Sequence, residues 1–251
     1  MSARKPSIAV SDARGVRTLH VGGEAIQSSM RIAEPCALAL DSTRCMLAFL
    51  LFHPEPRHAL MIGLGGGSLA KYFHKYLRGT ATRVVEIDPR IVVAARRHFA
   101  LPPDDARLTV EIGDGAEALA PECCDVLMVD AYHDEEHVPK LASEEFYDAA
   151  WLALGERGAL AVNYMNDDRN FDRYLQRLER AFGGAVLVMP ALYDPNILAF
   201  AFKGIENSFS WEGLRFKAEA LESRLDLPFS RYVNRMRAMN RHNPRELLLS
   251  A

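Results

Sequence analysis

From about residue 58, short apolar runs alternate with segments of helical periodicity. The apolar runs, which are typical of strands buried on both faces, read HALMIG, TRVVEI, RLTVEIG, DVLMVD and GALAVNY. The amphipathic segments between them read SLAKYFHKYLR, PRIVVAARRHF and SEEFYDAAWLAL. This alternation predicts an α/β fold, in which a Rossmann-like parallel sheet carries helices on both faces.

The pattern changes toward both ends of the chain. Two strand-like runs, AVLVMP and ILAFAFKG, follow each other without an obvious helix between them, so we expect the sheet to end in antiparallel strands. Near the N-terminus, RTLHVGGEAIQSSM alternates around Gly-Gly, as in a β-hairpin. We predict three parts: an N-terminal β-hairpin domain (1–35), a Rossmann-like domain entered through an apolar helix around 36–52 (36–206), and a C-terminal helical tail (207–251).

Composition limits the classes of partner. Lys and Arg total 30 against 33 Asp and Glu, so the net charge of -3 offers no general attraction for nucleic acid or anionic membranes. The tail carries several arginines, and a basic helix could track phosphates. A solvated helix face is the favoured interpretation, given the acidic overall balance. The arginines are Arg231, Arg235, Arg237, Arg241 and Arg245.

Cysteine usage and hydropathy indicate a compartment. The four cysteines, Cys36, Cys45, Cys123 and Cys124, show neither CxxC spacing nor the density of a disulfide scaffold. The first residues lack the apolar core of a signal peptide, and CMLAFLLF is too short to span a bilayer. We therefore expect a cytoplasmic protein without a membrane segment.

The first predicted strand ends in a glycine-rich turn, IGLGGGSL. Glycines at such a turn allow positive φ and close approach of a ligand to the backbone, and the following helix offers free N–H groups. Alone this is weak evidence, because tight strand-to-helix packing also uses glycine. The turn is compatible with a nucleotide-type ligand.

Acidic residues follow the next three strands. Glu86 ends the second, and a carboxylate there can accept hydrogen bonds from both ribose hydroxyls. Asp114 follows the third, where it can cap the next helix or bind an adenine amino group. Asp130 follows the fourth. Because several acids then meet at the ligand-binding edge and no pyrophosphate-binding basic residue stands out, a sulfonium nucleoside such as S-adenosylmethionine suits this site better than NAD.

Together these motifs resemble the spermidine synthase, or polyamine aminopropyltransferase, family. The similar segments include AIQSSM, MIGLGGGSL, VVEIDPRIV, IGDGAEAL, DVLMVDAYHDE and MPALYDPNILAFAFKG, over roughly residues 15 to 204. The resemblance implies a sheet of the S-adenosylmethionine-dependent methyltransferase type, decarboxylated S-adenosylmethionine as donor, a small-molecule amine as acceptor, and a homodimer. We expect no metal, for the reason given below for the segment HDEEH.

The resemblance also implies roles for individual residues. Asp130 matches the aspartate that accepts the proton of the attacking amine, a chemically sensible role because a protonated amine has no lone pair. His133 and Tyr193 occupy acceptor-site positions. The positions expected to bind the donor are Gln27, Gly63, Gly65, Gly67, Glu86, Asp114 and Gly115.

Three positions depart from the family pattern. Gly66 replaces the aspartate that holds the donor's amino end, His133 replaces the second aspartate of the catalytic loop, and Thr43 stands where the family has a catalytic tyrosine. All three changes remove groups suited to a polycation. The acceptor is therefore not necessarily putrescine.

The segment DAYHDEEHVP admits two chemical interpretations. On a helix, His133 and His137 would share one face, as zinc ligands can. The sequence is HDEEH rather than HExxH, however, and Asp130 is expected to end a strand. The favoured interpretation is a catalytic loop in which His133 alters acceptor choice, while a loop histidine bonded to a neighbouring acid is the structural alternative.

Three functions are compatible with these features. The primary hypothesis is aminopropyl transfer from decarboxylated S-adenosylmethionine to an amine. The second is methyl transfer from intact S-adenosylmethionine, because the loss of a carboxylate at Gly66 removes repulsion of the donor's own carboxylate. The third is a nucleoside-binding module without catalysis.

Overall fold

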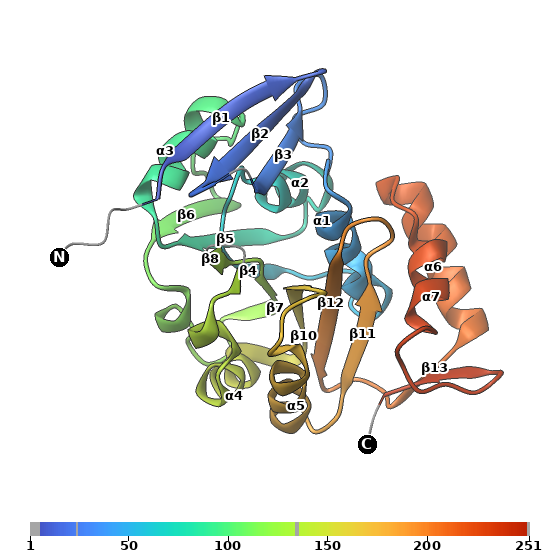
Figure 1. The fold of residues 1–251 in the computed structure, drawn as a ribbon. Coiled ribbons are helices and arrows are strands. Elements are labelled where there is room, and N and C mark those ends of the chain that lie inside the picture. The colour runs from blue at the N-terminus through green and yellow to red at the C-terminus, as the bar shows by residue number, and fades with distance from the viewer. Residues whose placement is uncertain (1–5, 24, 134–135, 250–251) are drawn as a thin grey trace.

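The computed structural model describes residues 6–23, 25–133 and 136–249, with the backbone alone at 133, 136 and 137. A seven-stranded sheet forms its centre (Figure 1). In spatial order the strands are β11 (Val186–Pro190), β12 (Asn196–Lys203), β10 (Leu154–Met165), β7 (Cys124–Val129), β4 (His58–Ile62), β5 (Ala81–Glu86) and β6 (Leu108–Ile112).

The pairing confirms the predicted α/β sheet. The five strands from β10 to β6 are parallel to one another, whereas β12 is antiparallel to both β10 and β11. Parallel strands buried on both faces favour near-continuous apolar runs, which the central strands β4 and β7 show most clearly. The expected antiparallel end of the sheet is therefore confirmed as well.

Helices cover both faces of this sheet (Figure 1). Residues of β4 alternate between two hydrophobic cores, with Ala59 and Met61 in one and Leu60 and Ile62 in the other. This alternation follows from the two-residue period of a strand. The first core packs against α2 (Ser68–Tyr76), α3 (Pro89–His98), α6 (Trp211–Leu225) and α7 (Phe229–Met236), and the second against α4 (Glu144–Ala153) and α5 (Phe171–Ala181).

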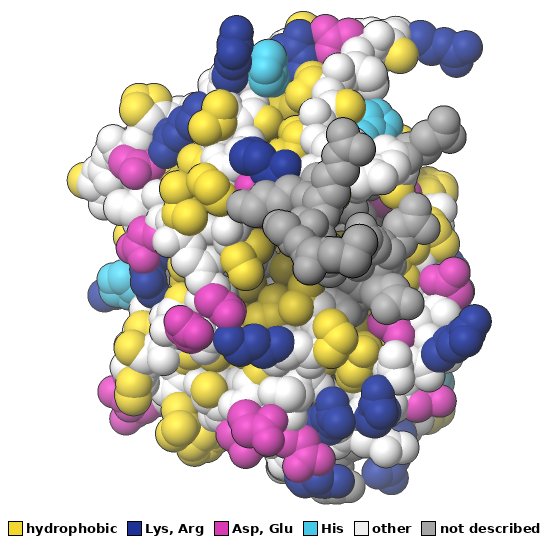
Figure 2. Space-filling view, turned by 60° about the vertical axis from the view of Figure 1, so that its left-hand side comes forward, with side chains coloured by type: hydrophobic (Ala, Val, Ile, Leu, Met, Phe, Trp, Pro, Cys, Tyr) yellow, Lys and Arg dark blue, Asp and Glu magenta, His cyan; other side chains and the backbone are white. Residues whose placement is uncertain are grey.

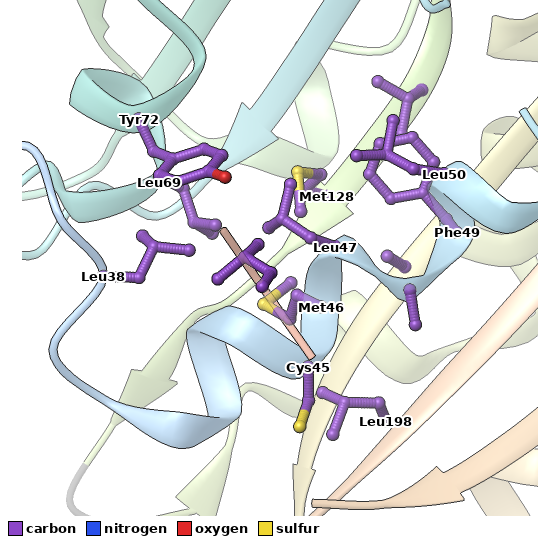
Figure 3. Close-up of a cluster of buried hydrophobic side chains, with 14 of the residues drawn as sticks. Leu38, Cys45, Met46, Leu47, Phe49, Leu50, Leu69, Tyr72, Met128 and Leu198 are labelled. Carbon is purple, nitrogen blue, oxygen red and sulfur yellow. The ribbon is translucent and has the colours of Figure 1, made fainter. Parts of the chain in front are cut away.

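The apolar segment that leads into the sheet does not form the single helix expected around 36–52. Its helical part is shorter, and much of it is a 3₁₀ helix. It forms α1 (Asp41–Cys45) and then the 3₁₀ helix η1 (Met46–Leu51), all six residues of which are buried. Figure 3 shows Met46 and Leu47 in one cluster with Leu69 and Tyr72 of α2 and Met128 of β7. Because η1 is apolar on every side, it occupies the interior of the first core rather than its surface.

The N-terminal region is a three-stranded antiparallel sheet of β1 (Ile8–Ala13), β2 (Val16–Val21) and β3 (Ile26–Arg31). The predicted hairpin accounts for β2 and β3, whereas β1 was not anticipated. A turn at Arg14 and Gly15, both with positive φ, connects β1 to β2. This sheet contacts α2 and α3.

The C-terminal region contains helices α6 and α7 and one short pairing that the sequence pattern did not indicate. Strands β13 (Ser208–Ser210) and β14 (Glu246–Leu248) pair in antiparallel fashion. They bring the two ends of the tail together. Among the described residues, no helix is both long and apolar enough to cross a membrane.

The buried η1 segment predicts a large loss of stability on truncation. Phe49 is 0% exposed, so Phe49→Ala should lower the free energy of unfolding by about 3–5 kcal/mol, since it leaves a cavity. Phe216→Ala is the control, because that ring is 75% exposed. Its effect should stay within about 0.5 kcal/mol in urea titrations, and similar losses in both variants would contradict this account of the core.

Candidate active site

A cavity of about 560 Å³ lies where β4, β5 and β7 end, beside the N-terminal sheet. Ligand sites of open α/β sheets occupy this position because parallel strands present their carboxyl ends together. Residues from β2 and β3, including Leu19 and Gln27, close one side. On the face shown in Figure 2, acidic and basic side chains are interspersed and no single charge dominates.

The glycine turn is imposed by a close approach between two strand ends. Gly63 has φ of 93°, and a Cβ at this position would lie 2.3 Å from the backbone oxygen of Asp130. No other residue fits there without displacing the end of β7. Gly63 and Gly65 line the cavity. Gly67, at φ of 70°, begins α2 but is not among the lining residues.

Two backbone N–H groups hold the Glu86 carboxylate beside this turn. Its Oε2 accepts a hydrogen bond from the backbone N–H of Leu64 at 2.9 Å, and its Oε1 accepts one from that of Asp88 at 2.9 Å. Burial raises the pKa of the Glu86 carboxyl, and the backbone N–H donors offset part of that rise. Each oxygen keeps a lone pair, so this fixed carboxylate can accept ribose hydroxyls.

Asp114 lines the cavity and caps the 3₁₀ helix η2 (Gly115–Glu117). Its Oδ1 accepts the backbone N–H of Ala116 at 2.9 Å, while its Oδ2 lies 2.5 Å from Nζ of Lys140. The Lys140 ammonium group lowers the pKa of Asp114. Gly115 is buried between this cap and Ile62, where a Cβ would meet Ile62 Cγ2 at 2.2 Å.

Two basic residues that the sequence analysis did not assign to the site also line the cavity. Lys140 lies on the 3₁₀ helix η3 (Pro139–Ala142), and Arg90 lies on α3, where it pairs with Asp88 at 2.5 Å. Asp88 and Asp114 are therefore each neutralised by a cation. The negative field inside the cavity comes mainly from Glu86 and Asp130, so it is weaker than the run of strand-end acids suggested.

Asp130 lies directly after β7 and is half-buried. Its Oδ1 accepts a hydrogen bond from Nδ2 of Asn163 at 3.0 Å, and Asn163 Oδ1 accepts one from Nδ2 of Asn196 at 3.0 Å. Burial raises the pKa of the Asp130 carboxyl, and the hydrogen bond from Asn163 partly counteracts this rise. A carboxylate that is oriented in this way and made more basic is suited to accept a proton.

Sequence reasoning missed the two asparagines. Asn163 is 4% exposed in the buried second half of β10, and Asn196 begins the neighbouring strand β12. A buried polar residue requires a hydrogen-bond partner, so the single Asn in GALAVNY was the available signal.

The segment after Asp130 is a small hairpin rather than a helix. Strands β8 (Tyr132–His133) and β9 (Glu136–His137) pair antiparallel, so the interpretation of HDEEH as a zinc-binding helix is wrong. The Tyr132 hydroxyl donates to the backbone oxygen of Asn163 at 2.7 Å, and Tyr132 lines the cavity. The predicted acceptor role of His133 concerns a side chain outside the described residues.

Tyr193 lies apart from the cavity lining. Its side chain is 70% exposed, its ring centroid lies 5.0 Å from the Arg231 guanidinium carbon, and its hydroxyl accepts a hydrogen bond from Arg231. Its backbone N–H donates to Asp41 at 2.6 Å, which ties this loop to the start of α1. Thr43, two residues further along α1, does line the cavity. The acceptor role of Tyr193 stays a prediction.

Within the part of the chain that the structure describes, no three His, Cys, Asp or Glu side chains lie where they could hold a metal ion together.

The family assignment rests on comparison with known proteins. The model of the "Spermine/spermidine synthase domain" matches residues 45–183. The chain is 33% identical over 246 residues to the polyamine aminopropyltransferase of Chromobacterium violaceum, covering 97% of this chain and 94% of the relative. The chain belongs to the spermine/spermidine synthase family. This agrees with the resemblance seen in the sequence motifs.

Solved structures similar to this family member include two kinds of protein. A probable spermidine synthase from Corynebacterium glutamicum superimposes with a TM-score of 0.72 at 19% identity, covering 95% of this chain and 93% of that one. Human methyltransferase-like protein 13, crystallised with SAH, has a TM-score of 0.64 at 26% identity over 76% of this chain and 91% of its own. The first comparison supports the fold alone.

The departure from the family pattern at Gly66 has a structural counterpart. A Cβ at residue 66 would lie 2.8 Å from Phe99 Cδ1 and 2.8 Å from Ser28 Oγ. Real Cβ atoms do not approach other atoms this closely, so Phe99 and Ser28 occupy the space that any side chain at this position would need. The loss of an aspartate that the resemblance implies at residue 66 is therefore accompanied by packing that fills its place.

This packing predicts that the family aspartate cannot simply be restored. Gly66→Asp should lower the free energy of unfolding by about 1–3 kcal/mol, because Phe99 or Ser28 must move. Gly79→Asp is the matched control, since a Cβ there meets no heavy atom within 4 Å. Its change should stay within about 0.5 kcal/mol in denaturant titrations. Equal effects would mean that the contacts at residue 66 yield without cost.

Proposed function

We propose that this chain transfers an aminopropyl group from decarboxylated S-adenosylmethionine to a small-molecule amine. The observation that carries the proposal is the Asp130 carboxylate, which is oriented by Asn163 and lines the same cavity as Glu86 and the glycine turn. The C. violaceum relative, which matches almost the full length of the chain, is named for this activity. We further propose that the protein acts in the cytoplasm as a homodimer.

The reaction follows from the charges of the donor and the site. Glu86 binds the ribose hydroxyls, and Asp114 stands at the adenine end. The uncharged amine attacks the carbon beside the sulfonium sulfur, so that a C–N bond forms while the C–S bond breaks and methylthioadenosine leaves. Asp130 accepts the proton that the nitrogen releases, and the raised pKa of its carboxyl strengthens it as a base. Holding both substrates in line supplies much of the remaining acceleration.

A methyltransferase that uses intact S-adenosylmethionine is the second candidate. Gly66 favours it, because no carboxylate at that position repels the carboxylate of the donor. The similarity to human methyltransferase-like protein 13, which was crystallised with SAH, is a second observation in its favour. Attack would then fall on the methyl carbon and release S-adenosylhomocysteine.

The donor is tested first by calorimetric titration of the purified protein. We expect decarboxylated S-adenosylmethionine and methylthioadenosine to bind at least about tenfold more tightly than S-adenosylmethionine and S-adenosylhomocysteine. Tighter binding of S-adenosylmethionine and S-adenosylhomocysteine would favour methyl transfer over aminopropyl transfer. Failure of all four to bind would exclude a nucleoside site in this cavity.

Catalysis is separated from binding by a second experiment. Asp130→Asn should reduce the rate of amine-dependent methylthioadenosine release by about 100-fold or more, since it removes the base. Its affinity for methylthioadenosine should change by less than about threefold, because the substitution is isosteric. Asp148→Asn, on the exposed side of α4, is the control. An unchanged rate in Asp130→Asn would remove this residue from the mechanism.

The hydrogen bond from Asn163 predicts a shift in pH dependence. Activity requires ionised Asp130, so the rate falls as the pH drops through the pKa of this carboxyl. Asn163 lowers that pKa, so Asn163→Leu should move the acid limb of the pH–rate profile to higher pH. Asn166→Leu, whose side chain is exposed three residues away, should leave the limb in place. An unshifted limb in Asn163→Leu would argue against this positioning role.

A further inference from the structure

A second depression, of about 460 Å³, lies against the C-terminal half of α2. It shares no lining residue with the cavity that contains Asp130. Its volume falls within the range of small-molecule sites and exceeds that needed for a single simple ion. The lining residues are Cys36, Lys71, His74, Lys75, Arg78, Ala100, Pro102 and Arg107.

The lining is rich in positive charge. Four of its eight residues are lysine or arginine, and a fifth, His74, carries charge only when it is protonated. Asp105 pairs with His74 at 2.8 Å. Glu34, the acid whose charge reaches Lys75, is already paired with Arg31 at 3.2 Å. The described carboxylates around the depression therefore compensate only part of this charge.

Lys71 is the most unusual member of this group. It is 1% exposed, and its Nζ donates to the backbone oxygen of Phe99 at 2.7 Å. Burial lowers the pKa of the Lys71 ammonium to about 8, and the interaction with Cys36 opposes only part of that shift. A buried ammonium that no carboxylate neutralises is costly, and an anion in the depression would reduce that cost.

The helix dipole explains why some of these basic residues lie at the end of α2, but it does not explain the position of Lys71. Basic residues near the C-terminus of a helix interact favourably with its dipole, which accounts for His74 and Lys75 in the last turn of α2. Lys71 lies one turn earlier. Arg107 comes from a different segment, where it donates to the backbone oxygen of His74 at 3.0 Å and so remains at the edge of the depression.

We propose that this depression is a binding site for a small molecule with two or more phosphate-type negative charges. Arg78 and Arg107 offer planar guanidinium donors, and Lys71 and Lys75 offer point charges, a combination suited to phosphate oxygens. Cys36, Ala100 and Pro102 provide an apolar side that an organic ligand can cover. Inorganic polyphosphate and an organic bisphosphate share this chemistry.

The test is calorimetry at constant ionic strength with two probes, inorganic tripolyphosphate and fructose 1,6-bisphosphate. Neither contains adenine, so neither mimics the proposed donor. Wild-type protein should bind at least one of them with a dissociation constant of about 1 mM or lower. The tighter-binding probe identifies the inorganic or the organic source.

Two double variants distinguish a site from general attraction. Lys75→Gln with Arg78→Gln should weaken binding at least about tenfold, because both side chains line the depression. Arg215→Gln with Lys217→Gln removes the same number of charges from exposed positions of α6 and should change the affinity by less than about twofold. Equal weakening in both, or no binding to wild-type protein at 10 mM probe (roughly ten times the expected limit), would overturn the proposal.

A third variant addresses the buried ammonium. Lys71→Met keeps the length of the side chain and removes its charge, so it should also weaken binding of the probe about tenfold or more. Thermal unfolding without the probe verifies that this variant is folded. Unchanged affinity in folded Lys71→Met protein would show that the buried charge plays no part, and would count against the site.

Discussion

The contact between the ends of β4 and β7 sets the geometry on which the rest of the site depends. The backbone oxygen of Asp130 occupies the place where a side chain at Gly63 would begin, 2.3 Å from a Cβ there. The two strands can end this close together only because residue 63 is glycine, at a φ that other residues rarely adopt. The same contact directs the glycine turn toward Glu86 and fixes the starting point of the Asp130 side chain.

Desolvation then gives the two unpaired carboxylates of the cavity their character. Glu86 and Asp130 are held by neutral donors, two backbone N–H groups for the first and the Asn163 amide for the second. Neutral donors orient a carboxylate without cancelling its charge, and burial raises the pKa of both groups. Asp88 and Asp114 are paired with cations instead. The cavity thus separates acids that remain available to a ligand from acids that mainly stabilise the loops.

Two of the departures that the resemblance implies, at Gly66 and Thr43, have defined surroundings in the structure. Gly66 is covered by Phe99 and Ser28, and Thr43 turns its hydroxyl to the backbone oxygen of Leu40 at 2.9 Å. The backbone oxygen of Phe99 also accepts a hydrogen bond from the buried ammonium group of Lys71. The residue that fills the space at Gly66 is therefore also the one that anchors the cation on the far side of α2. Packing at residue 99 links the donor end of the cavity to the basic depression.

The sequence by itself determined the architecture and the strand-end residues of the site. Continuous apolar runs separated by amphipathic helices require a covered parallel sheet, and parallel strands bring Gly63, Glu86 and Asp130 to one edge whatever the details of packing. The ordered motifs likewise determined the family. These inferences depend on local period and on a topological rule, both of which are visible along the chain.

Tertiary structure alone decided which of those groups are paired. The bond from Asn163 to Asp130 joins residues 33 apart, and that from Lys140 to Asp114 joins residues 26 apart. Such pairs depend on strand register and on how a loop folds back, which no local pattern encodes. The filling of the space at Gly66 by Phe99 and Ser28 is of the same kind, as is the meeting of Lys71 and Arg107 around the second depression. Side-chain proximity across separate segments exists only once the whole chain has packed.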